Sequence, residues 1–333
     1  MPPPAPVEAQ AGNPGRGREA LTIMRIAVLG AGAVGGYYGA VLQRGGSEVW
    51  FLARGQHLAA MRDRGLRVET AVEEPFTVAV RATDDPREIG PVDLVLFTVK
   101  AYDTPAAVRL LPPLLGPETA VLTLQNGVDS VEALAEAVGR RHVLGGLCQI
   151  FCTVGAPGLI RQTGGPRRVV LGELDGTVTG RVRAAGDAFR AAGVPVEIST
   201  RILVEMWEKF IFINAQGGMT ALTRLPIGII RQTPETFAMY LDVAEEVAAV
   251  GRAHGVPIPE GQRERVRAFA LALDPGSYSS LYTDLTAGRR TELDTLLGTV
   301  VRLGERYGVP TPACRAIYAA LRPHDLAART ARP

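Results

Sequence analysis

Two lysines and one asparagine stand where their side chains could take part in proton transfer. Lys100 follows the apolar run DLVLFTV, and Asn126 follows the next apolar run, AVLTL, in the sequence LQNG. Lys209 lies in the segment EMWEKFIFINAQ, among mostly apolar neighbours. An ammonium group in such surroundings can donate a proton or stabilise a developing negative charge. The alternative for Lys209 is a surface residue of which only the aliphatic stem contacts apolar side chains.

A glycine-rich turn near the start of the chain is typical of nucleotide binding. It follows the apolar run RIAVL, opens a predicted helix, and consists of Gly30, Ala31, Gly32, Ala33, Val34 and Gly35. The first glycine permits a tight turn, the second lets the backbone approach a pyrophosphate, and the third lets helix and strand pack closely. The helix start offers free N–H groups to the phosphates. The segment therefore predicts a dinucleotide cofactor, the alternative being a turn that merely requires glycine.

The residue after the second predicted strand indicates which dinucleotide is bound. The run VWFLA is followed by Arg54. A carboxylate at this place holds the ribose 2′-hydroxyl of NAD, whereas a guanidinium pairs with the 2′-phosphate of NADP. We therefore expect NADPH, with Arg54 at its 2′-phosphate. As the alternative, Arg54 would be a solvated loop residue.

Short apolar runs alternate with amphipathic stretches up to about Val170. Strands are expected over 25–29, 49–53, 93–99 and 120–124, and helices over 33–44, 56–64, 105–115 and 131–138. Because these strands are almost entirely uncharged and are separated by helices, we expect an α/β Rossmann-like domain with a parallel sheet covered on both faces. Residues 155–168 predict a hairpin that leads into a strand over 169–174. Ligands of such a sheet bind outside the carboxyl ends of its strands, where Lys100 and Asn126 stand.

The second half of the chain has the periodicity of helices. From Ile202 onward the segments are helical, and two of them end in Gly-Val-Pro, a typical helix stop. We therefore expect four parts: a disordered leader over 1–23, an NADP-binding Rossmann-like domain over 24–198, an all-helical substrate and catalytic domain over 199–325, and a loose tail over 326–333. The cleft between the two domains is the expected site.

Ser280 and Glu292 stand twelve residues apart. By themselves they are interpreted as a turn hydroxyl and a carboxylate in the first turn of a helix. Together with the other motifs they are more specific, because GAGAVGG, LAR, TVKAYD, LQNG, WEKFIFIN and SSLYTDLTAGRRTELD occur in the order found in the ketopantoate reductase family. On these motifs the chain resembles that family from about Met24 to Pro310. The resemblance implies a Rossmann-like domain, then a helical domain, with NADPH in the cleft.

The resemblance also implies a reaction, the reduction of 2-dehydropantoate to pantoate on the way to pantothenate and coenzyme A. The cofactor would be held by Gly30, Gly32 and Gly35 at the pyrophosphate, Arg54 at the 2′-phosphate, and Lys100 nearby. Asn126 would help to place the nicotinamide and the substrate. Lys209 would be the catalytic acid, since hydride delivery to a keto carbon leaves an alkoxide that an ammonium can protonate. Ser280 and Glu292 would bind the substrate, and Glu292 would also assist Lys209.

Two positions depart from the family pattern. Members of the family place asparagines four and eight residues after the catalytic lysine, whereas this chain has Ile213 and Gly217 there. At about 100° per residue, the nearby Asn214 falls on another face of the helix. We take Asn214 as a candidate substrate-binding residue and expect the pocket to hold the substrate hydroxyls differently. A related reductase of another branched 2-keto acid is therefore an open alternative.

Composition disfavours several other classes of protein. The 333 residues carry a net charge of +2 and 6% aromatic residues, which disfavours nucleic-acid binding. Three cysteines cannot build a disulfide framework, and Cys148 and Cys152 lack the histidine or carboxylate partners of a metal site. The uncharged run over 26–42 is glycine-rich and short for a membrane span, so no membrane is expected.

We therefore expect a cytoplasmic enzyme whose partner is a small-molecule keto acid. Apolar helical faces in the second domain could serve a homodimer or belong to the core. A protein that senses NADPH without turnover is the alternative from another class. It is disfavoured because sensing would not require Lys209, Asn126, Ser280 and Glu292 together.

Overall fold

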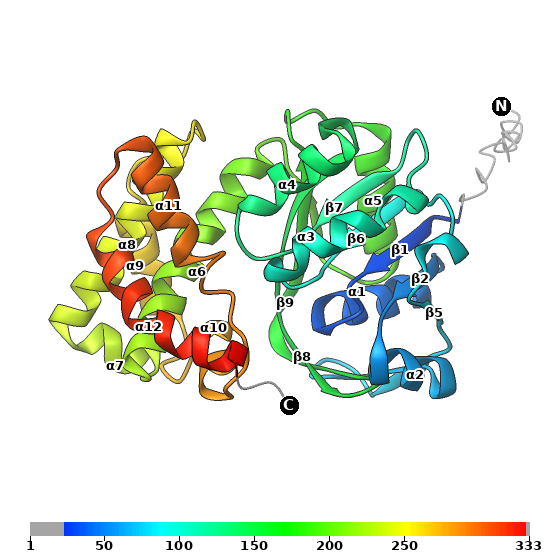
Figure 1. The fold of residues 1–333 in the computed structure, drawn as a ribbon, viewed down its shortest axis with the longest axis horizontal. Coiled ribbons are helices and arrows are strands. Elements are labelled where there is room, and N and C mark those ends of the chain that lie inside the picture. Colours follow the sequence, from blue (N-terminus) through cyan, green and yellow to red (C-terminus); the bar gives the residue numbers. More distant parts are fainter. Residues whose placement is uncertain (1–22, 331–333) are drawn as a thin grey trace, which may run out of the picture.

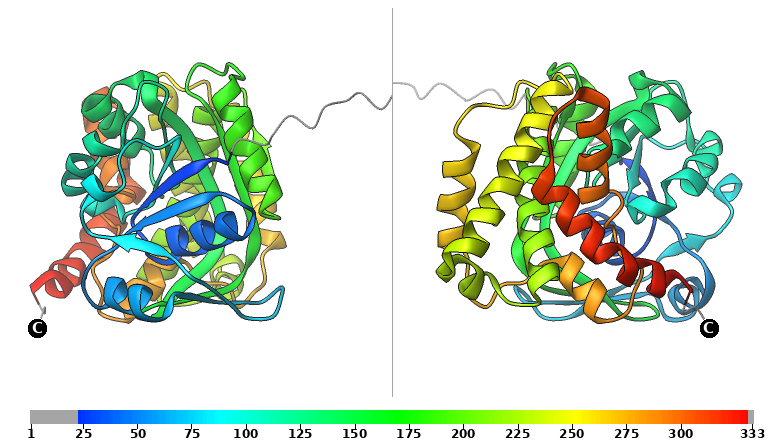
Figure 2. Two further views of the ribbon diagram at one scale, coloured as in Figure 1. Left: turned by 90° about the vertical axis from the view of Figure 1, so that its right-hand side faces the viewer. Right: turned by 60° about the vertical axis from the view of Figure 1, so that its left-hand side comes forward.

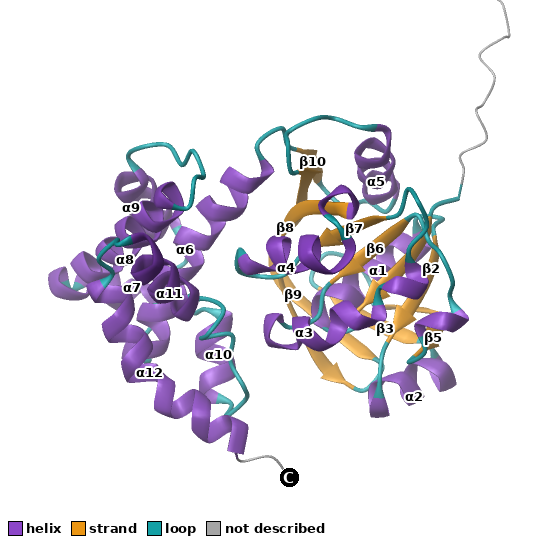
Figure 3. Cartoon of the chain, turned by 45° about the horizontal axis from the view of Figure 1, so that its top comes forward, coloured by secondary structure: helices purple, strands orange, loops and turns teal. Residues whose placement is uncertain are grey.

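The computed structural model describes residues 23–330 as an α/β half and a helical half that lie side by side (Figure 1). Figure 3 shows the strands confined to the first half. The strands are β1 (Arg25–Leu29), β2 (Glu48–Leu52), β3 (Leu66–Thr70), β4 (Phe76–Val78), β5 (Arg81–Thr83), β6 (Leu94–Phe97), β7 (Ala120–Thr123), β8 (Val143–Ala156), β9 (Leu159–Glu173) and β10 (Val196–Ile198). The helices among them are α1 (Ala33–Arg44), α2 (Gly55–Arg64), α3 (Thr104–Ala107), α4 (Asp129–Val138) and α5 (Gly180–Ala191). The expected leader lies outside the described residues, apart from the exposed Ile23.

The strands of the described chain form one sheet in the order β4-β3-β9-β8-β7-β6-β1-β2-β5, with β10 beside β9. The central strands β2, β1, β6 and β7 run parallel. Alternate residues of β1 belong to different cores, Ile26 and Val28 with residues of α1 and α5, Ala27 and Leu29 with residues of α4. Both faces are thus covered, and the expected α/β fold with a parallel sheet is confirmed. The segments that follow β1, β2, β6 and β7 meet at one edge of the sheet.

The hairpin expected within residues 155–168 is present, but its strands are much longer than predicted. β8 and β9 pair antiparallel, and the chain turns at Pro157 and Gly158. The glycines at 164 and 165, which suggested a turn, lie opposite irregularities in β8 instead. β9 also pairs in parallel with β3, so the sheet is mixed at this end. The hairpin forms the long green strands in the left view of Figure 2.

The helix expected over 105–115 is broken. α3 is followed by two short 3-10 turns, Val108–Leu110 and Pro112–Leu114. Pro112 and Pro113 lack the N–H group that an α-helix uses, and proline disfavours helical conformation in the residue before it. Leu111 and Leu114 are nevertheless fully buried, so the segment still covers the sheet.

The helical half is built round one long helix. Its elements are α6 (Ile202–Thr223), α7 (Ile227–Gln232), α8 (Pro234–Ala253), α9 (Gln262–Ala272), α10 (Ser280–Thr286), α11 (Leu297–Tyr307) and α12 (Pro312–Thr330). α6 packs on α8, where a Cβ on Gly251 would lie 2.6 Å from the Trp207 ring. α6 also contacts β8, so one of its faces is turned to the sheet. None of the helices within residues 23–330 is long and apolar enough to cross a membrane.

The tail expected to be loose from residue 326 is helical as far as Thr330, because α12 continues through it. Asp325 is wholly buried and accepts hydrogen bonds from the N–H (3.0 Å) and the hydroxyl (2.6 Å) of Thr291. Arg329 Nη2 lies 2.5 Å from a carboxylate oxygen of Asp325 and 2.5 Å from one of Asp294. These ion pairs fix the end of α12, and no apolar periodicity in the sequence indicates them.

Candidate active site

The glycine turn between β1 and α1 contains two glycines that the protein packing requires and one that it does not. Gly30 has a φ of +104°, and a Cβ there would lie 2.6 Å from the backbone nitrogen of Val99. A Cβ on Gly35 would lie 2.3 Å from the Gly30 carbonyl oxygen and from the Thr98 hydroxyl. A Cβ on Gly32 would meet no atom of the described chain within 4 Å. The open space at Gly32 fits a ligand that must approach the backbone, as a pyrophosphate does.

The start of α1 is available to an anion. Gly32 is its N-cap, and no side chain caps the helix, so the first N–H groups from Ala33 and Val34 onward face the turn. The Thr98 hydroxyl donates a hydrogen bond of 2.9 Å to the Gly30 carbonyl, and the Ala31 N–H donates one of 3.2 Å to Leu52. The turn is thus held by strands on either side of β1. The residues present fit the pyrophosphate of a dinucleotide.

Arg54 stands directly after β2, at the same edge of the sheet. It is the N-cap residue of α2, and its side chain is 83% exposed. Its Nη2 lies 3.3 Å from Oδ2 of Asp103, a partner that the sequence reasoning did not identify. Such an exposed ion pair is weak. The guanidinium is therefore free to exchange this partner for a phosphate group.

Lys209 joins the two halves of the molecule. From α6 its Nζ donates a hydrogen bond of 3.0 Å to Oδ1 of Asn126 and one of 2.9 Å to the carbonyl oxygen of Cys148. Asn126 follows β7, and Cys148 lies in β8. The structure thus brings together two predicted residues that are 83 positions apart in the chain.

A small pocket opens beside this amine. Its sheet side is formed by Gln125, Gly127, Gly146 and Leu147, and its helix side by Met206, Lys209, Phe210 and Ile213. Gln125 was not predicted as a site residue. Its side-chain amide donates a hydrogen bond of 2.8 Å to the Val99 carbonyl oxygen and one of 3.0 Å to the Thr104 hydroxyl. The pocket therefore holds one amine at the junction of sheet and helix, which is the arrangement that proton transfer to a bound carbonyl requires.

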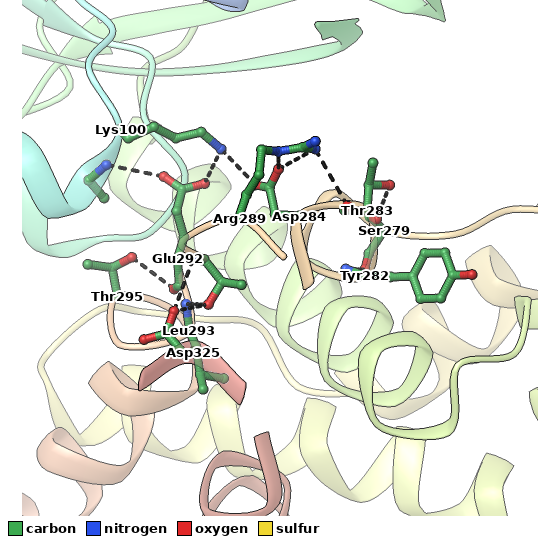
Figure 4. Close-up of polar contacts among 12 residues, drawn as sticks. Lys100, Ser279, Tyr282, Thr283, Asp284, Arg289, Glu292, Leu293, Thr295 and Asp325 are labelled. Atoms are coloured by element: carbon green, nitrogen blue, oxygen red, sulfur yellow. Dashed lines mark hydrogen bonds and ion pairs between the residues drawn. The ribbon is translucent and has the colours of Figure 1, made fainter. Parts of the chain in front are cut away.

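Lys100 forms a second contact between the two halves (Figure 4). Its Nζ lies 3.2 Å from Oδ2 of Asp284 and 3.4 Å from Oε2 of Glu292, which is buried. The other Glu292 oxygen accepts a hydrogen bond of 3.1 Å from the Ala101 N–H. Burial alone would lower the pKa of Lys100, but the negative charges of Glu292 and Asp284 outweigh it and raise the pKa above the ordinary lysine value.

Asp284 is a site residue that the sequence reasoning missed. Besides meeting Lys100, its other oxygen accepts hydrogen bonds of 2.9 and 2.8 Å from the guanidinium of Arg289. One signal in the sequence could have indicated this region. Of the 36 basic residues only two are lysines, and both of them, Lys100 and Lys209, contact the opposite half of the molecule. A chain that uses arginine at every other basic position is expected to keep lysine where a compact amine is needed.

Glu292 and Ser280 are placed differently from what the resemblance implies. The Glu292 carboxylate bonds to Lys100 and Ala101 instead of pairing with Lys209. Ser280 is exposed in the first turn of α10, while its neighbour Ser279 caps that helix by accepting from the Tyr282 N–H. Within the described chain no hydrogen bond joins Ser280 to the other predicted residues. Their roles toward a substrate stay predictions.

Asn214 is corrected by the structure. Its side chain is wholly buried inside the helical core, and its amide donates a hydrogen bond of 2.8 Å to the carbonyl of Phe210 in the same helix. The side chain points away from the pocket because its position is one residue, about 100°, past Ile213 on the helix. A substrate at Lys209 therefore does not reach Asn214 in this structure.

Two family models match the chain and together cover most of it. Residues 26–176 match ketopantoate reductase PanE/ApbA, and residues 201–325 match the C-terminal part of the same family. A 2-dehydropantoate 2-reductase of Caulobacter vibrioides is 34% identical over 303 residues, which cover 89% of this chain and 97% of that protein. An uncharacterized oxidoreductase of Bacillus subtilis, YkpB, is 31% identical over 303 residues, which cover 91% of this chain and 99% of that protein.

Solved structures agree with these matches. A PanE/ApbA family ketopantoate reductase from Ralstonia eutropha JMP134 is 36% identical and has a TM-score of 0.83. The match covers 92% of this chain and 100% of that chain. A D-mandelate dehydrogenase solved with NADH and anilino(oxo)acetate has a TM-score of 0.82 at 23% identity, which shows a shared fold alone. The fold and the glycine turn define an oxidoreductase with a Rossmann-type dinucleotide-binding domain. Within that class, the chain belongs to the ketopantoate reductase family, as its motifs predicted.

The glycine turn yields a paired prediction. Gly32→Ala is expected to change the free energy of unfolding by less than about 1 kcal/mol, because the new Cβ meets no protein atom. It is expected to weaken binding of the nicotinamide dinucleotide at least about tenfold, because the Cβ fills the space that the ligand needs. Gly35→Ala serves as the contrast and is expected to cost about 1–3 kcal/mol of stability through its backbone clash. Stability is measured by thermal unfolding, and binding by calorimetric titration with NADPH and with NADH. Unchanged binding of both dinucleotides in Gly32→Ala would contradict the assignment of the glycine turn.

The two lysines permit a direct measurement of the Lys100 pKa. Protein labelled with ε-¹³C-lysine gives two lysine signals, and Lys209→Ala identifies the one from Lys100. At about pH 10.4, where an ordinary lysine is half deprotonated, Lys100 is expected to remain charged. Glu292→Gln is expected to lower the Lys100 pKa, because it removes the negative charge with the larger electrostatic effect on Lys100 while the amine stays buried.

The matched control is Asp129→Asn, which removes a carboxylate from a different contact between the two halves. Asp129 Oδ2 accepts a hydrogen bond of 2.6 Å from the Thr299 hydroxyl and lies 3.2 Å from Nη2 of Arg302. This variant is expected to leave the Lys100 titration unchanged. Equal titration curves for wild type and Glu292→Gln would show that the ion pair is not formed in solution.

Proposed function

We propose that this chain catalyses the NADPH-dependent reduction of 2-dehydropantoate to pantoate, a step of pantothenate and coenzyme A biosynthesis in the cytoplasm. Family membership supports reduction of a 2-keto acid, and several relatives carry the name 2-dehydropantoate 2-reductase. The single observation that carries the proposal is the Lys209 amine, which is held at a pocket on the sheet edge that also carries the glycine turn.

When bound, NADPH supplies a hydride, that is two electrons and one hydrogen nucleus, to the keto carbon. The carbonyl π bond breaks, and its electron pair moves to the oxygen. Lys209 donates a proton to this oxygen, so that a hydroxyl group is formed, and the amine regains a proton from solvent afterwards. Two of the three ammonium N–H groups are satisfied by Asn126 and Cys148, which leaves the third for the substrate oxygen.

The remaining predicted residues have positioning and binding roles in this proposal. Asn126 holds the amine in place and can orient the ligand beside it. Glu292 and Lys100 hold the two halves together through their ion pair. The exposed hydroxyl of Ser280 can bind the substrate carboxylate by hydrogen bonding. Gly30, Gly32 and Gly35 form the pyrophosphate turn, and Arg54 binds the 2′-phosphate.

Removing the amine tests the mechanism. Lys209→Ala is expected to lower kcat for keto-acid reduction by about 10²-fold or more, because no other amine occupies this place. Lys209→Arg keeps a positive charge, but its guanidinium does not release a proton, so it is expected to remain impaired. NADPH oxidation is followed by absorbance, and NADPH binding and thermal unfolding are measured in the same preparations. Near-normal turnover in Lys209→Ala would reject the amine as the acid, whereas NADPH binding without turnover by the wild type would favour a sensor.

The cofactor preference is tested at Arg54. Arg54→Ala is expected to raise KM for NADPH by about 10- to 100-fold, since charge-assisted hydrogen bonds to a phosphate are lost. KM for NADH is expected to change little, because NADH has no 2′-phosphate. Arg64→Ala, at the other end of the same helix, is the control and should leave both constants unchanged. Equal changes for the two cofactors in Arg54→Ala would overturn the NADPH assignment.

A further inference from the structure

One face of α6 forms the helix side of the pocket. Met206, Lys209, Phe210 and Ile213 line it, at the spacing of residues that share a helix face. Gly217 stands one turn further along, where a Cβ would lie 3.6 Å from the Leu281 side chain. Leu281 is the neighbour of Ser280 at the start of α10. Leu281 therefore covers Gly217, and Ile213 is the side chain of α6, one turn after Lys209, that a keto acid held at the amine would meet.

This stretch of the helix offers no side-chain hydrogen bond. Ile213 is half-buried and apolar, Gly217 has no side chain, and Asn214 is turned into the core. Gln125 is the other polar side chain of the pocket, and it belongs to the sheet side, next to Asn126. Its Oε1 lacks a partner within the described chain. That oxygen is buried, so it offers no contact to the distal end of a ligand, which would rest on Ile213.

Resting on the proposed function, we infer that the site holds 2-dehydropantoate and other branched 2-keto acids by their apolar side chains, without recognising the distal hydroxyl group of 2-dehydropantoate. Ile213 is the specificity-determining residue. A hydroxyl placed against it leaves water without gaining a hydrogen bond, which is unfavourable. An apolar methyl group at the same place is favoured, because its burial is driven by the hydrophobic effect.

The chemistry supplies a matched pair of substrates. 3,3-Dimethyl-2-oxobutanoate differs from 2-dehydropantoate only in a methyl group where the latter has a hydroxymethyl group. An apolar pocket discriminates against an added hydroxyl by up to about 10²-fold. We expect kcat/KM of the wild type to be about 10-fold higher for the acid without the hydroxyl, measured by NADPH oxidation. A ratio below one would overturn the inference and leave the proposed function intact.

A variant moves the preference in a known direction. Ile213→Asn places an amide at the pocket and is expected to shift the ratio of the two kcat/KM values at least about 10-fold toward 2-dehydropantoate. Ile229→Asn is the matched control, since Ile229 is an exposed isoleucine on α7, away from the pocket. It should leave the ratio unchanged. An unchanged ratio in folded Ile213→Asn would also overturn the inference, and the wild-type comparison decides it if that variant does not fold.

Binding measurements distinguish a failure of the proposed function from a failure of the inference about the apolar site. The two 2-hydroxy acid products are titrated into the wild-type complex with NADP⁺ by calorimetry. If neither keto acid is reduced, the proposed function fails, and tighter binding of the product without the distal hydroxyl still supports the apolar site. Tighter binding of pantoate, or binding of neither product, would overturn the inference.

Discussion

One amine ties the helical half of the molecule to the edge of the sheet. Lys209 projects from α6, yet both of its hydrogen-bond acceptors belong to the other half, one after β7 and one within β8. The same edge carries the glycine turn after β1 and Arg54 after β2, since these strands run parallel. The position of the amine relative to a ligand on the sheet thus depends on how α6 packs against β8. The ion pairs of Lys100 with Glu292 and Asp284 form a second contact that joins the same two halves.

The division between lysine and arginine follows from the same requirement. Arginine forms the surface ion pairs of this chain, as at Arg263 with Asp242 and Arg302 with Asp129. Its planar guanidinium suits carboxylates but is wide and stays protonated. At Lys209 the space between helix and sheet admits a compact group whose N–H bonds diverge toward two acceptors and a ligand. At Lys100 one ammonium meets two carboxylates of the opposite half, and their charges overcome the effect of burial. Both lysines of the sequence therefore contact the half of the molecule to which they do not belong.

The parts of the structure dictated by backbone requirements could be predicted from the sequence. Glycines at 30 and 35 are needed by the packing itself, and the apolar runs of β1, β6 and β7, which alternate with helices, indicated a parallel sheet. The order of the strands in that sheet was not predicted. The long β8–β9 hairpin could not be predicted, because glycines at 164 and 165 lie opposite irregularities and resemble a turn. Nor could the end of α12, which is held by the ion pairs of Asp294 and Asp325. The family motifs assigned Lys209 and Asn126 to one site, and the structure joins them by a hydrogen bond. The pairing of Glu292 with Lys100 depends on how the two halves meet, which no local pattern encodes.

The sequence of the dinucleotide-binding turn is more constrained than the sequence of the pocket beside Lys209. A pyrophosphate is held by backbone N–H groups and a helix start, so the turn at residues 30–35 tolerates few sequences and identifies the cofactor class. The helix side of the pocket is formed by side chains of α6, and a change at one such position alters no backbone hydrogen bond. Ile213 illustrates this freedom, because it lines the pocket four residues after Lys209 without taking part in the hydrogen bonds of the amine. Family membership therefore fixes the reduction of a 2-keto acid more firmly than it fixes which keto acid, because the substrate side chain depends on single pocket residues such as Ile213.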